Sequence, residues 1–236
     1  MATDTSRGRV EFFEDFIGWD IVADQPEYGV DTDPAIEVVG TEPNGVVRIT
    51  MDGAQSNIGG LLFGQTQWDI SQGPLIVEAR VRLSAIGTAN ERVGVWLTDL
   101  QEDTLSEYPF TLATTVVTAA ADPNDAVGMF WEGDPTNKSW YLLSQNTDSL
   151  VIDSLTNMAA GNRTVPVAAT WQTLKMVIND DGKDVEFSVD GKVLYRYIGS
   201  TAAVADVPLI PVFGVTEGTT AINADIDYIY VSGSRI

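Results

Sequence analysis

The chain has 236 residues, of which 44% are hydrophobic and 20% are charged, which is the composition of an ordinary globular protein. It carries 13 basic against 34 acidic residues and a net charge of −21, so phosphate backbones and anionic lipid surfaces are repelled. Cysteine and histidine are both absent from the sequence. These two absences exclude disulfides, Ser-His-Asp and Cys-His hydrolases, and most zinc enzymes.

The first ten residues differ in charge from the chain that follows. They contain Arg7 and Arg9 with Asp4 as the single acid, whereas ten acidic and no basic residues lie between Arg9 and Arg48. Residues 1–10 are predicted to form an arm that docks on an acidic partner or a neighbouring copy, with a frayed terminus as the alternative. These residues hold no apolar signal core, and no run approaches the roughly 18 apolar residues of a membrane span. We therefore expect an unsecreted product that makes no membrane contact.

Residues 11–236 are predicted to form one all-β domain. Val77, Ala79 and Val81 are separated by charged residues, which is the period-two pattern of a strand with one buried face. So many antiparallel strands at this length favour a two-sheet sandwich over one open sheet, because an open sheet leaves unpaired edges. Short β-rich runs recur along the chain without a dividing linker, at Val46–Met51, Ile58–Phe63, Val93–Leu97, Ala126–Trp131, Trp140–Leu143, Trp171–Asn179, Val185–Val189, Val193–Ile198, Leu209–Val215 and Ala224–Val231.

Asp-Gly pairs mark the tightest turns. Asp181-Gly182 and Asp190-Gly191 separate apolar runs, and such pairs supply the positive φ of a two-residue hairpin. Residues 171–198 are therefore predicted to form a three-stranded meander. The stretch Thr114–Ala121 is rich in Ala but also β-branched, so the pattern leaves open whether it forms a turn of helix. The predicted core contains Val77, Val81, Leu97, Leu174, Met176, Phe187 and Val189.

The order of several segments resembles that of a known superfamily. These segments are Pro74–Leu83, Val93–Leu97, the meander pieces Trp171–Met176 and Val185–Lys192, and the closing strand Ala224–Val231. Together they resemble the concanavalin A-like, laminin-G-like jelly-roll superfamily over nearly the whole chain. The resemblance implies an antiparallel two-sheet jelly-roll sandwich. It specifies function poorly, because the superfamily includes lectins, glucanases, adhesion domains and virion proteins.

The resemblance also provides a test for an active site. Glucanases of this superfamily carry two glutamates in Glu-x-Asp-x-x-Glu or Glu-x-Asp-x-Glu, as nucleophile and acid on one strand face. The sequence contains neither motif. Asp225 and Asp227 share one face of the closing strand and could act as a carboxylate pair, but ion pairing at the sandwich surface is the favoured interpretation. The sequence therefore predicts a protein without a catalytic centre.

Two groups of residues are candidates for sugar binding. If Val77 and Val93 point into the core, the opposite face of neighbouring strands carries a candidate ligand surface formed by Arg80, Arg82, Arg92 and Trp96. The Trp would stack on a sugar and Arg would hold an acidic group; the alternative is a ladder of charge pairs with Trp96 covered by a loop. Trp131 and Trp140 flank the loop 132–137 as a second candidate, an aromatic platform, and burial in the core is its alternative.

Calcium is the cofactor that the resemblance implies, because lectin and laminin-G-like relatives often bind it through Asp side chains and backbone carbonyls. The candidate loops are Asp99–Asp103, Asp122–Asp125 and Asn179–Asp184. None of them has the regular spacing of an EF-hand, and turn formation by Asn and Asp is the alternative. The sequence assigns no particular metal site.

Two hypotheses about function follow. The first rests on the resemblance: a non-enzymatic bacteriophage virion protein, either a capsid decoration protein or a fibre or tail-associated component. It would be made in the host cytoplasm and docked in many copies on capsid or other virion proteins, as a homo-oligomer such as a trimer. A strongly acidic surface suits such a particle exterior, which must stay soluble. The second hypothesis is a carbohydrate-binding module or a degenerate glycoside hydrolase, with a glycan as its partner.

Overall fold

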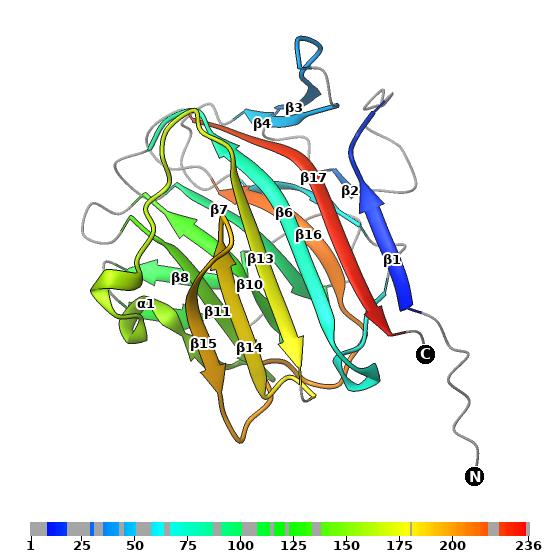
Figure 1. Cartoon of the computed structure of the whole chain (residues 1–236), viewed down its shortest axis with the longest axis vertical. Coiled ribbons are helices and arrows are strands. Elements are labelled where there is room, and N and C mark those ends of the chain that lie inside the picture. Colours follow the sequence, from blue (N-terminus) through cyan, green and yellow to red (C-terminus); the bar gives the residue numbers. More distant parts are fainter. Residues whose placement is uncertain are drawn as a thin grey trace.

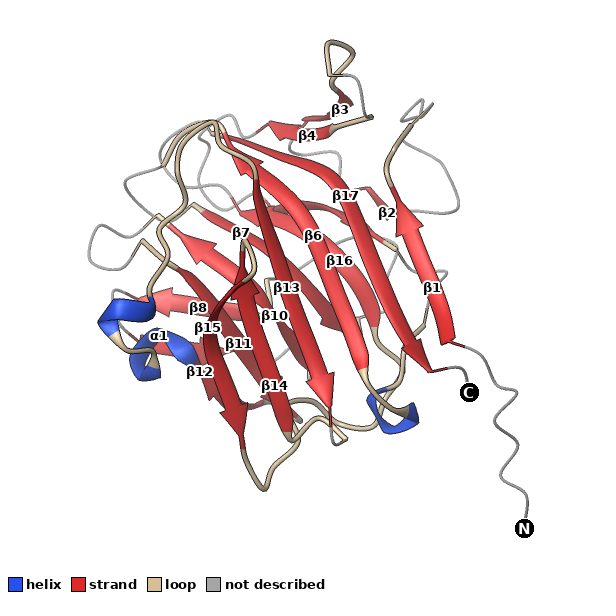
Figure 2. Cartoon of the chain, viewed as in Figure 1, coloured by secondary structure: helices blue, strands red, loops and turns tan. Residues whose placement is uncertain are grey.

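The computed structural model describes residues 9–17, 29–30, 35–42, 45–50, 58–63, 67–86, 91–100, 108–113, 116–120, 123–133, 138–179, 181–216 and 222–234. Strands make up almost all of the regular structure in these residues, and they form two layers that face each other (Figures 1 and 2). Alternating apolar residues favour such strands, because each strand must bury one face against the other layer. Asp-Gly pairs favour the tight turns that connect neighbouring strands.

We name the first layer sheet A. Among the described residues it contains eight strands, and β1 (Arg9–Glu14) pairs with β17 beside the main path. Figure 1 shows this contact between the first and last strands, drawn in blue and red. The order of the other strands is β15 (Lys192–Ile198), β14 (Asp184–Val189), β13 (Gln172–Asn179), β6 (Leu75–Leu83), β17 (Asn223–Ser234), β4 (Val47–Thr50) and β3 (Ala35–Val38).

We name the second layer sheet B, and the described part of the chain contributes seven strands to it. Their order is β12 (Ser149–Asp153), β11 (Trp140–Asn146), β10 (Ala126–Glu132), β7 (Arg92–Thr98), β16 (Ile210–Thr216), β5 (Ile58–Leu62) and β2 (Gly29–Val30). A separate hairpin consists of β8 (Phe110–Ala113) and β9 (Val116–Ala119). The described helices are single turns, η1 (Ile70–Gln72), α1 (Ser154–Asn157) and η2 (Ala160–Asn162).

The two sheets bury their faces differently. Along β6 buried and half-buried residues alternate strictly, so sheet A packs one face on the core and leaves the other partly exposed. Along β10 and β16 every residue is buried, so the central strands of sheet B are covered on both faces. All of the residues predicted for the core are at most 2% exposed, which confirms that part of the prediction: Val77, Val81, Leu97, Leu174, Met176, Phe187 and Val189.

The predicted meander is confirmed as β13, β14 and β15, which are paired in that order. Asp181 and Asp190 adopt positive φ of 49° and 50°, as the predicted turns require. For the stretch Thr114–Ala121, where the sequence pattern leaves a turn of helix open, the described residues contain strand β9. Its β-branched residues fit the extended backbone that pairs with β8.

Candidate functional site

The predicted ligand surface of Arg80, Arg82, Arg92 and Trp96 is wrong as a single surface. The strand β6, with Arg80 and Arg82, pairs with β13 and β17 of sheet A. The strand β7, with Arg92 and Trp96, pairs with β10 and β16 of sheet B. Local alternation indicates correctly which residues turn away from the core, but it carries no information about which sheet a strand joins. The two halves of the predicted surface therefore lie on opposite sides of the sandwich.

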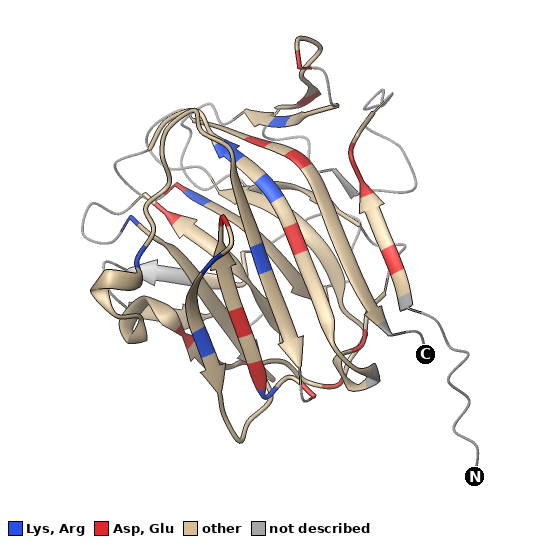
Figure 3. Cartoon of the chain, viewed as in Figure 1, with Lys and Arg blue, Asp and Glu red and all other residues tan. Residues whose placement is uncertain are grey.

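On the outer face of sheet A, the arginines of β6 form a cross-strand charge ladder. Arg82 Nη2 lies 2.6 Å from Asp225 Oδ2 and 2.9 Å from Glu42 Oε1, and Arg48 Nε lies 2.7 Å from Asp225 Oδ1. Arg80 Nη1 contacts Asp227 Oδ2 at 2.5 Å. Figure 3 shows basic and acidic residues side by side across β13, β6 and β17.

The ladder occupies the two carboxylates that could have acted as an acid–base pair. The hydrogen bond from Arg48 to Asp225 raises the pKa of that guanidinium above its ordinary value, against the opposing effect of desolvation. The ring of Trp171 lies against both β6 arginines, with guanidinium carbons 4.9 Å and 4.3 Å from its centroid. On this face Asp225 and Asp227 therefore act as ion-pair partners of the arginines, as the favoured interpretation expected.

Trp131 and Trp140 are buried at 0% and 1% exposure, so the predicted accessible platform is wrong and its alternative, core packing, is what the structure shows. The two residues are register partners on β10 and β11. The indole Nε1 of Trp140 donates a hydrogen bond of 3.0 Å to Gln172 Oε1 on β13, across the space between the sheets. Both indole N–H groups find partners in the interior, that of Trp131 with the Lys138 carbonyl, so the rings are buried without leaving a donor unpaired.

The outer face of sheet B carries an aromatic cluster under a cover. Trp96 of β7 and Phe130 of β10 have ring centroids 5.6 Å apart. Tyr108 packs over both rings at 5.1 Å and 5.5 Å, and Phe110 packs on Phe130 at 5.1 Å. Gly94 makes room for this cover, since a Cβ atom there would meet the Tyr108 hydroxyl at 2.6 Å. Trp96 is therefore covered by the segment leading into β8, as the alternative interpretation expected.

Three polar atoms on this face are buried without a hydrogen-bond partner among the described residues. They are the Trp96 indole Nε1, the Tyr108 hydroxyl and the Thr216 hydroxyl. Burial raises the pKa of Tyr108 well above 10, so its hydroxyl stays protonated and able to donate. Such groups cost free energy when they are left without partners, and a bound ligand is one of the ways in which proteins satisfy them.

An ion pair lies in the same area. Glu132, Arg92 and Thr216 occupy one register row across β10, β7 and β16. Arg92 Nε is 3.4 Å from Glu132 Oε1, with side chains 16% and 5% exposed. Gly94 lies two residues from Arg92 along β7, so both are on the same face of the strand, and a Cβ atom on Gly94 would meet the Tyr108 hydroxyl at 2.6 Å. The Tyr108 hydroxyl therefore lies over the same part of the sheet as the pair. We call Arg92, Glu132, Thr216, Tyr108 and Trp96 the polar row.

Of the polar row, only Arg92 and Trp96 were predicted from the sequence as site residues. Glu132 follows the β-rich run ending at Trp131, so alternation places it on the face opposite to the Trp131 side chain. Nothing in the local pattern places Thr216 or Tyr108 beside it, because that contact depends on the order of strands in sheet B and on the cover.

The predicted calcium loops serve the fold where they are described. Asp99 Oδ1 accepts a hydrogen bond from the Asp125 backbone N–H, and Asp125 Oδ1 accepts from the N–H groups of Thr147 and Ala205. Asp184 pairs with Arg196, and this hydrogen bond lowers the pKa of Asp184. Within the described residues no group of three or more His, Cys, Asp or Glu is arranged to hold a metal ion. The other residues of these loops, 101–103, 122 and 180, lie outside the described part.

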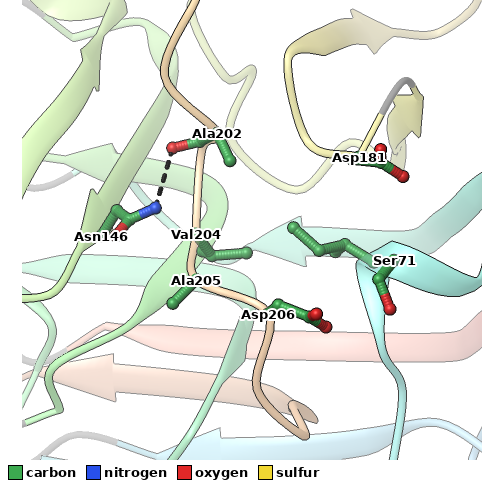
Figure 4. A pocket seen from close by; sticks show the side chains of 8 residues that line it. Ser71, Asn146, Asp181, Ala202, Val204, Ala205 and Asp206 are labelled. Carbon is green, nitrogen blue, oxygen red and sulfur yellow. Dashed lines mark hydrogen bonds between the residues drawn. The ribbon is translucent and has the colours of Figure 1, made fainter.

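A pocket of about 350 Å³ opens between η1 and the connection from β15 to β16 (Figure 4). Ser71, Asn146, Asp181 and Asp206 supply its polar lining. The Asn146 amide is already used, because it donates to the Ala202 carbonyl at 3.1 Å. A hydrogen bond and the like charge of Asp69 raise the pKa of Asp206. The pocket is a weaker candidate than the polar row because its side chains are exposed or already bonded.

The predicted docking residues lie at the start of the chain. Arg7 lies outside the described residues, and Arg9 is the first residue of β1, with its backbone opposite Ser234 of β17. Arg9 and Val10 thus extend the sheet, and the arm hypothesis stays a prediction. In the described part of the chain, no helix combines the length and apolar character needed to cross a membrane.

The two sheets and their order define a concanavalin A-like jelly roll, which confirms the predicted fold class. An endo-acting O-glycanase from the human gut microbiota matches with a TM-score of 0.61 and 14% identity, over 93% of this chain and 97% of the other. Peanut lectin matches with a TM-score of 0.58 and 11% identity, over 97% and 99%. SCLam, a non-specific endo-β-1,3(4)-glucanase from family GH16, matches with a TM-score of 0.57 and 14% identity, over 96% and 92%. No protein-family model and no curated protein matches the sequence.

Proposed function

We propose that this protein binds a carbohydrate on the outer face of sheet B, at the polar row. The observation that carries the proposal is the set of three buried polar atoms, Trp96 Nε1, Tyr108 Oη and Thr216 Oγ1, without partners among the described residues. A sugar offers hydroxyl groups that both donate and accept, so it can satisfy an indole N–H and two hydroxyls together. The likeness to lectins and glycanases supports the same choice at the level of the fold.

The aromatic cluster provides the second element of a sugar site. Sugar rings stack on aromatic faces, and Trp96, Phe130 and Tyr108 gather such faces in one place. Because Trp96 is 0% exposed beneath Tyr108, we expect the segment 108–113 to shift when the ligand enters. The hairpin β8–β9 belongs to neither main sheet, so such a shift leaves the sandwich pairing intact.

The proposal is for binding and not for hydrolysis. Glycosidases need two carboxyl groups about 5–10 Å apart across the scissile bond. On the three central strands β10, β7 and β16, Glu132 is the one carboxylate, and it is engaged with Arg92. A reducing-sugar assay on β-glucans and on mucin tests this part: release of sugar by the purified protein would refute it.

Tyr108→Phe tests the binding site. The substitution removes only the hydroxyl, so the unfolding free energy should stay the same or rise by up to about 1 kcal/mol, since a buried group without a partner disappears. Glycan affinity should fall about tenfold, the value of one lost hydrogen bond. Affinity is measured by calorimetry with a glycan identified on an array.

Tyr197→Phe is the matched control for this experiment. Tyr197 lies on β15 of sheet A, where its hydroxyl donates to the Thr201 carbonyl at 2.9 Å. Its loss should leave glycan affinity unchanged. Equal affinities in wild type and Tyr108→Phe would contradict the site, and failure of the wild type to bind any glycan would contradict the function.

The virion hypothesis stays a prediction from resemblance. The structures compared above are lectins and glycanases, and no contact among the described residues points to a capsid. Occupancy on a particle for the full chain against a chain lacking residues 1–10 remains its test. Calcium likewise stays a prediction, tested by the change in melting temperature when the ion is added or chelated.

A further inference from the structure

The chemistry of the polar row points to one class of glycan, and this step rests on the proposed function. We propose that the outer face of sheet B selects uncharged, hydroxyl-rich glycans and rejects acidic ones such as uronates, sulfated sugars and sialylated chains. The inference replaces the expectation that arginines on this surface hold an acidic group. It follows from the state of Arg92, from the chemistry of the unsatisfied groups, and from the charge of the whole chain.

Arg92 is already neutralised. It is the one basic residue on strands β10, β7 and β16, and its Nε lies 3.4 Å from Glu132 Oε1. Both side chains are largely withdrawn from water, at 16% and 5% exposure. An anionic sugar would have to displace Glu132 or lie beside a buried carboxylate. Either outcome leaves a negative charge uncompensated in a place with little water, which is strongly unfavourable.

The three groups of the polar row without a hydrogen-bond partner among the described residues are all uncharged. Trp96 offers an indole N–H, Thr216 offers an aliphatic hydroxyl, and Tyr108 offers a phenol that stays protonated because burial raises its pKa well above 10. Neutral donors and acceptors fit sugar hydroxyls, and the Arg92–Glu132 pair adds one donor and one acceptor side by side. Two adjacent hydroxyls, one accepting from Arg92 and one donating to Glu132, match this arrangement.

The charge of the chain acts in the same direction. A net charge of −21 repels anions over about a Debye length, roughly 8 Å at physiological salt. This repulsion weakens as salt rises, whereas the local effect of Glu132 persists, because buried pairs are screened much less than exposed ones. The two contributions can therefore be separated by measuring affinity at two salt concentrations.

The experiment compares matched polysaccharides that differ only in charged groups. The pairs are polygalacturonate and its carboxyl-reduced form, sulfated and unsulfated dextran, and mucin glycans before and after removal of sialic acid and sulfate. The neutral member should bind at least about tenfold more tightly at about 0.01 M ionic strength, and part of the preference should persist at about 0.1 M. An acidic member that binds as tightly as its neutral partner overturns the inference and leaves the proposed function standing. Absence of binding to every glycan instead refutes the proposed function.

Glu132→Gln tests the residue that sets the preference. The change removes the negative charge that lies 3.4 Å from Arg92 Nε, so affinity for the acidic members should rise several-fold relative to the neutral members. Glu186→Gln on β14 of sheet A is the control, since it changes the net charge equally and should leave the preference unaltered. An unaltered preference in a folded Glu132→Gln protein, judged by near-ultraviolet circular dichroism, overturns the role of Glu132. The wild-type comparison remains decisive whether or not this variant folds.

Discussion

Asp225 is 1% exposed, and its carboxylate accepts hydrogen bonds from the guanidinium groups of Arg48 and Arg82. Burying a carboxylate without such partners would cost several kcal/mol of folding free energy. The two arginines offset this cost, which explains why a charged residue can be buried in the sheet. The same contacts leave little room for acid–base chemistry, because a general base must reach a proton on a substrate. Asp227, bound to Arg80, is in the same situation. At the scale of single residues, sheet A uses its charges for structure.

Phe187 provides a test of the core at the same scale. It is 0% exposed and lies on β14, where its register partner is Met176 of the neighbouring strand β13 in sheet A. Phe187→Ala should lower the unfolding free energy by about 3–5 kcal/mol, because it removes buried apolar atoms and leaves a cavity. Chemical denaturation measures the change. Val193→Ala, at a residue that is 47% exposed, is the control and should stay within about 0.5 kcal/mol. A change near zero for Phe187→Ala would contradict its place in the core.

At the scale of elements, the meander was predictable because its signals are local. Asp181-Gly182 and Asp190-Gly191 fix the turns through positive φ, and β13 alternates between buried and half-buried residues over its whole length. Sheet A leaves its outer face partly exposed, so the sequence pattern and the burial pattern coincide there. The fold class follows from such strands together with the resemblance.

Sheet B was less predictable for a physical reason. Its central strands are buried on both faces, so apolar residues such as Trp96 and Phe130 occur on the face that alternation would assign to solvent. Strand order is a long-range property, and β6 and β7 follow each other in sequence while joining opposite sheets. The residues of the polar row come together only because of that strand order, and Tyr108 is contributed by the segment that covers Trp96. Sequence patterns therefore predicted the ladder and the covered Trp96 only as alternatives.

The contact between β7 and β10 gives a prediction at this scale. Gly128 is the register partner of Trp96, and a Cβ atom there would lie 2.7 Å from Trp96 Cα and 2.7 Å from the Val95 carbonyl oxygen. Because these are backbone atoms, no side-chain rotation relieves the clash. Gly128→Ala should lower the unfolding free energy by about 3 kcal/mol or more and abolish glycan binding with it.

Gly161→Ala is the matched control for that prediction. Among the described residues, no atom outside its chain neighbours and its own helical turn lies within 4 Å of a Cβ atom built on Gly161, and its backbone is not in the left-handed region. Its stability should stay the same or rise slightly, because alanine restricts the unfolded chain. Thermal melting of the three proteins side by side measures both effects. A Gly128→Ala protein as stable as wild type would show that the two strands can separate to admit a methyl group.

At the scale of the whole molecule, negative charge is the dominant property. The net charge of −21 keeps copies apart over roughly a Debye length and also opposes the compact state itself. Arg48, Arg80 and Arg82 already form ion pairs with Asp225 and Asp227 in the ladder on sheet A. Their positive charges therefore do not offset acidic residues elsewhere on the surface. Any further negative charge therefore adds to a repulsion that is already large. High pH is a simple way to add it.

Tyrosine ionisation links this charge to stability. Burial raises the pKa of Tyr108 well above 10 and that of Tyr141 to about 12, and burial followed by a hydrogen bond to Glu78 raises the pKa of Tyr228 to about 12. In the unfolded chain these phenols ionise near pH 10. Between about pH 10 and 12 the unfolded state thus binds fewer protons than the native state, so the free energy of unfolding falls as pH rises.

We therefore expect alkaline denaturation with a defined slope. Each deeply buried tyrosine, Tyr108 and Tyr141, should remove up to about 1.4 kcal/mol per pH unit above about pH 10. Urea unfolding at successive pH values measures this slope, and tyrosinate absorbance should rise in two steps, with the buried phenols ionising only as the chain unfolds. Tyr108→Phe removes one titrating group, so its slope should be shallower than that of wild type. Stability that stays constant through this range, or ionisation of every phenol in the folded protein, would show that the cover over Trp96 admits water and that Tyr108 is not buried as the proposed site requires.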